Sequence, residues 1–165
     1  MLKKLSTTIL FCLISAFVFA QTAPRQVLSE QDINNFITNY DKIMQALNVL
    51  ESKYDYLLKE IGTDFESMIK IRTIEMPPEI QNILRANGLG NNGFEKVMVI
   101  IQGLTVLQLE GDLNMLLAAG SPDPMYIEYL NQSINSLKPL KDSINSRDLA
   151  LLNNRKTELF QFLFE

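Results

Sequence analysis

Residues 33–61, INNFITNYDKIMQALNVLESKYDYLLKEI, decide the fold class of this chain. When they are written in heptads, all a and d positions are apolar or aromatic, and three e positions widen the stripe. The a and d residues are Ile33, Phe36, Tyr40, Ile43, Leu47, Leu50, Tyr54, Leu57 and Ile61, and the e residues are Ile37, Met44 and Leu58. A stripe of this width is typical of a helix that faces two neighbours. The pattern predicts one helix over about 30–61, roughly 48 Å long.

The ends of this predicted helix carry capping residues. Ser29 is a suitable N-cap, with Asp32 three positions later in the arrangement of a capping box. Gly62 is a suitable C-cap. The g positions show no alternating charge, so the pattern favours the long arm of a bundle over an intermolecular coiled coil.

A second strong pattern covers residues 94–119, where apolar residues occur on nearly all sides of the expected helix. Its uncharged run, 97–109, has 13 residues. Such a run reaches about 20 Å, which is short of a hydrocarbon core of about 30 Å. The pattern therefore predicts the central helix of a soluble bundle, buried all round.

Turn and capping residues predict the remaining helices. They cover about 64–72, 78–86, 124–137 with a break or kink at Pro139, and 146–163. No segment of useful length alternates with a period of two residues. We therefore expect an all-α fold, a helical bundle of five to six helices in one domain over 29–165.

Residues 1–20, MLKKLSTTILFCLISAFVFA, have the pattern of a secretory signal peptide. Lys3 and Lys4 precede an uncharged, mostly apolar segment of 11 residues, and Ala20 ends a small-residue cleavage site. The alternative is an uncleaved anchor, although the uncharged stretch 5–21, of 17 residues, lies at the lower limit for a membrane span. We expect cleavage after Ala20, a flexible leader over 21–28, and a secreted or periplasmic protein of a bacterial cell envelope.

The composition excludes several kinds of chemistry. The chain has no histidine, and its single cysteine, Cys12, lies in the predicted signal peptide, so the mature chain would be free of cysteine. Ser-His-Asp and Cys-His triads and His-ligated metal or haem sites are therefore impossible. Residues 1–20 hold two lysines and no acid, so cleavage changes the formal charge from −4 to −6. This acidity argues against nucleic acid and anionic lipid as partners.

Two patterns look like sites but lack the required context. Glu110 and Asp112 are the carboxylates that a glycan hydrolase would use, but residues two apart on a helix do not share a face. Gly88, Gly90 and Gly93 spell GxGxxG after a helix rather than a strand, which indicates a turn. We therefore predict no catalytic, cofactor-binding or metal-binding residues.

Two features suggest places for contact with a neighbour or a partner. Gly103 and Gly111 lie on similar sides of the predicted central helix, with Leu107 between them. They indicate either a close helix crossing or a groove for an apolar ligand. Near the C-terminus, Phe162 and Phe164 do not share the inward face of the last helix. They indicate either packing on the end of the bundle or an exposed interface.

Residues 104–108 spell LTVLQ, which is similar to the LTxxQ motif of the Spy/CpxP type of periplasmic stress chaperones. That family carries the motif twice and at a helix start, whereas here it occurs once and within a helix, so we assign no family. The sequence leads us to expect a non-enzymatic envelope protein, a binding or interaction module, with a chaperone-like helper as the alternative and a carboxylate-dependent glycan hydrolase as a distant third. We expect a monomer or weak dimer, an unknown envelope protein or apolar ligand as partner, and no transmembrane span after signal cleavage.

Overall fold

The computed structural model describes residues 23–59, 62, 64–120 and 123–164. Within these residues the chain forms α-helices and 3₁₀-helices and no β-strand. The eight α-helices are α2 (Glu30–Thr38), α3 (Tyr40–Lys53), α4 (Phe65–Lys70), α5 (Pro78–Ala86), α6 (Gly93–Ala119), α7 (Pro124–Asp142), α8 (Ser146–Asn154) and α9 (Lys156–Phe164), and the 3₁₀-helices are η1 (Asp55–Leu57) and η2 (Ile71–Thr73). The all-helical class is confirmed. The predicted signal peptide, Cys12 and the cleavage site lie outside the described residues.

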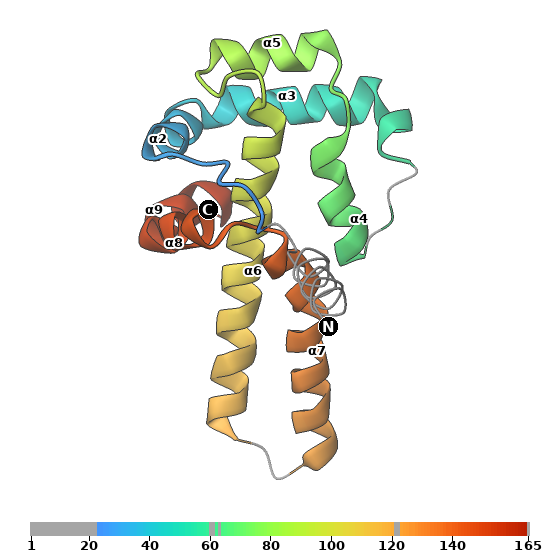
Figure 1. The fold of residues 1–165 in the computed structure, drawn as a ribbon, viewed down its shortest axis with the longest axis vertical. Helices are drawn as coiled ribbons and strands as arrows, with labels where there is room; N and C mark the ends of the chain where they lie inside the picture. The colour runs from blue at the N-terminus through green and yellow to red at the C-terminus, as the bar shows by residue number, and fades with distance from the viewer. Residues whose placement is uncertain (1–22, 60–61, 63, 121–122, 165) are drawn as a thin grey trace, which may run out of the picture.

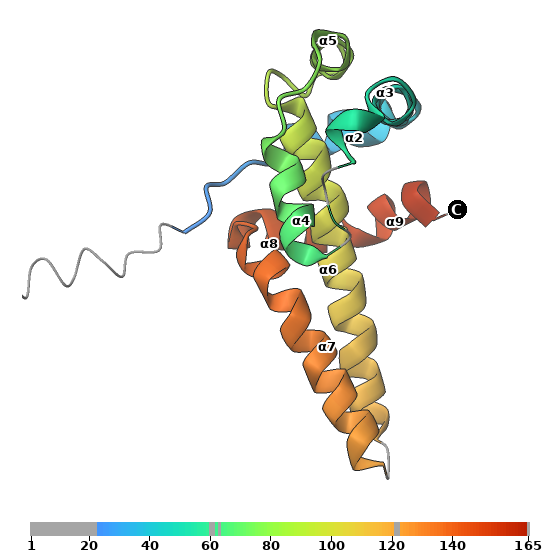
Figure 2. The same ribbon diagram turned by 90° about the vertical axis from the view of Figure 1, so that its right-hand side faces the viewer.

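Helix α6 is the axis of the molecule (Figures 1 and 2). Figure 1 shows α3 and α5 side by side across its N-terminal end, α8 near its middle, and α7 returning along its C-terminal half. Helix α6 contacts α2, α5, α7 and α8, whereas α3 packs mainly on α5. The chain therefore gathers most of its elements around one half of α6.

The two halves of α6 differ in burial. The first half supplies buried side chains from Phe94 to Val106 to the core. In the second half Leu109, Met115 and Leu116 are exposed, because among the described helices only α7 runs along it to its end (Figures 1 and 2). The expectation of burial along the whole helix is wrong for this half. None of the described helices is both long and apolar enough to cross a membrane.

The helix predicted over 30–61 is divided at Asn39 and ends at Lys53. Asn39 has φ −114° and ψ 23°, and its side-chain amide donates to the carbonyl oxygens of Asn35 at 3.2 Å and Asn87 at 3.4 Å. An asparagine amide competes in this way with the helical hydrogen-bond ladder. The capping box of Ser29 and Asp32 is confirmed, but Gly62 lies beyond the end of α3 and is not its C-cap.

The C-terminal predictions also need correction. The helix expected over 146–163 is divided at Arg155, which ends α8 and whose side chain binds Glu30 and Glu158. The two divided helices explain why eight α-helices occur among the described residues instead of five or six.

Helix α7 continues through Pro139 without ending there. Pro139 is exposed, so the carbonyl group that loses its partner to the proline faces solvent.

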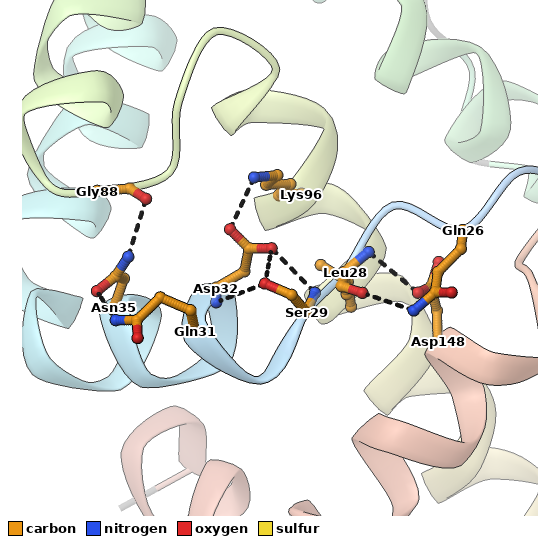
Figure 3. A network of polar contacts seen from close by, with 9 residues as sticks. All are labelled: Gln26, Leu28, Ser29, Gln31, Asp32, Asn35, Gly88, Lys96 and Asp148. Carbon is orange, nitrogen blue, oxygen red and sulfur yellow. Dashed lines mark hydrogen bonds and ion pairs between the residues drawn. The ribbon is translucent and has the colours of Figure 1, made fainter.

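A buried polar network holds the segment before α2 (Figure 3). Asp148 of α8 is fully buried, and its carboxylate accepts hydrogen bonds from the backbone N–H groups of Val27 at 2.8 Å and Leu28 at 3.0 Å. Burial raises the pKa of Asp148, although the two N–H donors act in the opposite direction. Asp32 accepts a hydrogen bond from Lys96 Nζ at 2.7 Å. The end of the predicted flexible leader is therefore fixed against α8.

Candidate functional site

Exposed apolar side chains gather on the part of the molecule where α6 and α7 project from the other helices (Figure 1). Six of the eight large hydrophobic side chains that are exposed among the described residues belong to these two helices. They are Leu109, Met115, Leu116, Met125, Tyr126 and Tyr129, and the other two are Tyr56 and Phe162. Large exposed apolar side chains that are concentrated in one region of a protein mark a candidate interaction site.

Helical spacing explains this surface. Val106 in α6 and Leu130 and Leu137 in α7 are buried where the two helices meet. Leu109, Leu113 and Leu116 follow the i, i+4, i+7 spacing on the adjacent side of α6, and Met125 and Tyr129 follow the i, i+4 spacing on α7. Together with Tyr126 they form the surface that we call the hairpin face. Two packed helices bury only the side chains that lie between them, so the other apolar side chains of this part of α6 and α7 stay exposed.

A groove runs along this face, and we call it the Tyr129 groove. Its volume is about 250 Å³. Its apolar walls come from Leu109 and Leu113 of α6, Tyr129 and Leu137 of α7, and Phe65 of α4. Its polar lining consists of Asp112, Ser133 and Ser136. The groove therefore starts beside the N-terminal end of α4 and follows the two longer helices.

The charge of this region is one-sided. Residues 97–137 contain no lysine or arginine but four acids, Glu110, Asp112, Asp123 and Glu128. Asp112 is exposed, and its carboxylate accepts a hydrogen bond from Gln108 at 2.8 Å. Glu110 pairs with Lys141 at 2.6 Å. A negative carboxylate, that of Asp112, therefore borders the Tyr129 groove, whereas the carboxylate of Glu110 is paired with Lys141 of α7.

The structure separates the glycines that the sequence analysis grouped. At Gly103 an added Cβ would lie 2.4 Å from Cδ1 of Leu152, so α6 and α8 cross closely here. Gly111 is exposed, and the nearest atom to an added Cβ is Lys156 Nζ at 3.9 Å. Leu107 lies between them, half-buried, and its carbonyl oxygen accepts a hydrogen bond from Lys156 at 3.4 Å. The close crossing therefore involves Gly103 and not Gly111.

Of the two predicted interface aromatics, Phe162 is 43% exposed. Its ring lies 6.2 Å from the ring of Tyr40, measured between centroids. Phe162 thus contacts the start of α3 with one side and solvent with the other. Phe164 belongs to α9, but its side chain lies outside the described part of the structure.

The remaining patterns do not form a reactive centre among the described residues. Glu110 borders a second hollow of about 260 Å³ together with Lys138 and Lys141, whereas Asp112 borders the Tyr129 groove. The two carboxylates thus open onto different hollows. Gly88 and Gly90 have φ values of 83° and 75° and form the turn between α5 and α6. No group of three or more metal-ligating side chains occurs in the described ranges.

Sequence reasoning missed Met125 and Tyr129 as site residues. Two features of the sequence could have indicated them, namely the aromatic residues near the start of the fifth predicted helix and the absence of lysine and arginine over 97–137.

The chain matches no protein-family model, and comparisons with curated proteins and with solved structures find no significant match.

Proposed function

We propose that this protein is an exported, non-enzymatic protein-interaction module of a bacterial cell envelope, and that it binds its partner through the hairpin face. The observation that carries this proposal is the concentration of exposed apolar side chains on α6 and α7. Met125 and Tyr129 are 76% and 63% exposed, respectively. Large side chains of this kind contribute most to an interface when a partner removes them from water.

The proposed location rests on the sequence of residues 1–20. A positive start, an apolar segment and a small-residue cleavage site are together typical of export. A bacterial envelope would place the hairpin face in contact with other exported proteins. Fractionation of cells and N-terminal sequencing of the purified protein test this part of the proposal, and the expected first residue is Gln21.

The lining of the Tyr129 groove favours binding over catalysis. Its polar groups are one carboxylate, of Asp112, and the hydroxyl groups of Ser133 and Ser136. A hydrolase that uses two carboxylates needs both on opposite sides of the scissile bond. The chain also has no histidine to activate a serine. Apolar walls with a few polar groups suit the recognition of a side-chain surface.

A chaperone-like role is the second candidate, and an exposed methionine favours it. Met125 of the hairpin face is 76% exposed, the largest exposed fraction among the large hydrophobic side chains of the described residues, whereas Met115, at 65%, lies outside that face. Methionine side chains are flexible and adapt to many partners. A chaperone would therefore bind many unfolded exported chains through the same face, whereas an interaction module would bind one partner.

Site-specific photo-crosslinking distinguishes these roles. The photoreactive residue p-benzoylphenylalanine replaces Tyr129 in one variant and Tyr56 in a matched control, because Tyr56 is 60% exposed but lies far from the hairpin in sequence and fold. We expect one discrete adduct from position 129 and none from position 56. Many adducts from position 129 would favour the chaperone role. Equal labelling from both positions, or none from either, would contradict binding through the hairpin face.

A further inference from the structure

We propose that the segment bound in the Tyr129 groove is a cationic amphipathic α-helix, which lies along α6 and α7 as a third helix beyond the end of α4. This inference rests on the proposed function, because it names the chemistry of the partner for the same site. It is carried by three observations, which concern the position of α4, the spacing of the groove walls and the charge of the hairpin.

Helix α4 shows how this face accepts a helix. It packs on α7 within the same chain, and Figure 2 shows it along the upper part of α6 and α7. Its first residue, Phe65, lines the Tyr129 groove. The helix is six residues long, so the face continues beyond it without a covering element among the described residues. A docked helix would continue the packing that α4 begins.

The groove walls have helical spacing on both sides. Leu109 and Leu113, four residues apart, form a ridge that lines it from α6, and Tyr129, Ser133 and Leu137, also four residues apart, form the ridge that lines it from α7. Ridges of this kind accept the side chains of a third helix between them. A segment that binds as an added β-strand would instead need an unpaired strand edge, and the described part of the chain has no strand. A helix therefore satisfies its own backbone groups while its apolar side fills the groove.

The charge of the hairpin selects the polar side of that helix. Asp112 borders the groove, and Asp64 and Glu66 flank Phe65 in the sequence and are exposed. Asp112 is the charged residue of the groove lining, and residues 97–137 contain no lysine or arginine. Lysine or arginine beside the apolar stripe of the partner would be attracted to these acids. A second copy of this chain would bring another hairpin with the same acids, so like charges oppose self-association through this face.

Binding of two synthetic peptides to the purified protein tests the inference. The peptides share one leucine pattern for an amphipathic helix, and all polar positions are lysine in one and glutamate in the other. Fluorescence anisotropy gives the dissociation constants. We expect the lysine peptide to bind and to weaken as salt is added, because exposed charges are screened. Equal or tighter binding of the glutamate peptide would overturn the inference.

Two pairs of variants locate the bound peptide. Tyr129→Ser should weaken binding of the lysine peptide, whereas Tyr56→Ser, which changes a tyrosine of similar exposure, should leave it unchanged. Asp112→Lys should weaken the lysine peptide by about two- to fivefold, the effect of one exposed ion pair, and should favour the glutamate peptide. Glu51→Lys on the exposed side of α3 is the control for net charge. Equal effects within either pair would overturn the proposed position.

Two further outcomes would also overturn the inference. Self-association that Tyr129→Ser abolishes would make a second copy the occupant, and binding of the protein alone to vesicles of anionic lipid, lost in Tyr129→Ser, would make the occupant a membrane. The crosslinking experiment separates this inference from the proposed function. A discrete adduct at position 129 together with no binding of the lysine peptide leaves the function standing and refutes the cationic helix. Absence of any adduct refutes the function itself.

Discussion

Gly103→Ala is expected to destabilise the protein, whereas Gly111→Ala is expected to stabilise it, although both glycines lie in α6. An added Cβ at position 103 would lie 2.4 Å from Cδ1 of Leu152, and Leu152 is fully buried. Its side chain therefore has little space to move. At position 111 the nearest atom is Lys156 Nζ at 3.9 Å, at the end of a flexible side chain.

The magnitude follows from two opposing effects. Alanine is better than glycine in a helix interior by about 1 kcal/mol, and this gain applies at both positions. Overpacking a close contact costs about 1–3 kcal/mol, and this cost applies at position 103 alone. The free energies of unfolding of the two variants should therefore differ by about 1–3 kcal/mol. Gly111→Ala should exceed the wild type by up to about 1 kcal/mol.

Urea unfolding followed by circular dichroism measures both values, provided that the slopes agree between variants. Leu152→Ala supplies the decisive background, because it removes the atom that the new Cβ would meet. Alone it should cost about 2–5 kcal/mol, and in its presence Gly103→Ala should become stabilising. If Gly103→Ala stabilises the wild type as much as Gly111→Ala does, the close crossing of α6 and α8 is refuted.

Three further predictions concern the buried polar network and the hairpin face. Burial raises the pKa of Asp148 above its ordinary value of 3.8. The folded protein therefore binds a proton at this carboxyl group more tightly than the unfolded chain does, which stabilises the fold at low pH. This contribution is lost as the pH rises through the raised pKa. The free energy of unfolding of the wild type, relative to that of Asp148→Asn, should therefore fall as the pH is raised from 3.8 towards neutrality. If urea unfolding shows that this difference between the two proteins stays constant or rises, the prediction is contradicted. Lys96→Met leaves the carboxylate of Asp32 without its cation at a site where the side chains of Lys96 and Asp32 are 15% and 9% exposed. The variant should therefore lose about 3–5 kcal/mol of the free energy of unfolding. A loss below about 1 kcal/mol would indicate an ordinary surface ion pair. Tyr129→Ser should change the free energy of unfolding by less than about 0.5 kcal/mol while weakening the binding of the lysine peptide, and a larger loss of stability would mean that Tyr129 serves the fold.

Local sequence rules predict the elements whose ends depend on nearby residues. Ser29 begins α2, Asp64 begins α4 and Asp123 begins α7, each through its own side chain. These caps act within three residues and need no knowledge of the fold. The division at Asn39 is different, because one of its two amide contacts is the carbonyl oxygen of Asn87, 48 residues away. The heptad pattern alone could not reveal it.

The buried half of α6 was predictable, and the site was not. An apolar pattern shows that a helix can be buried, but the number of helices available to cover it depends on the tertiary arrangement. Here α2, α5 and α8 contact α6 and enclose the half that contains Gly103. Leu109 and Leu116 continue the same apolar pattern beyond the reach of these helices, so their exposure follows from where the covering helices lie.

This uneven covering is itself an argument for binding. The exposed half of α6 gains little from folding, because Leu109, Met115 and Leu116 stay in contact with water. Full burial of one such side chain contributes about 1.5–3 kcal/mol, and Leu109 and Leu116 are still 39% and 40% exposed, so a helix laid along the hairpin face would recover part of this contribution at each of them. Cations on that helix would also lie beside Asp112, where residues 97–137 provide none. The fold thus leaves uncovered the surface that a cationic, apolar partner is best suited to cover.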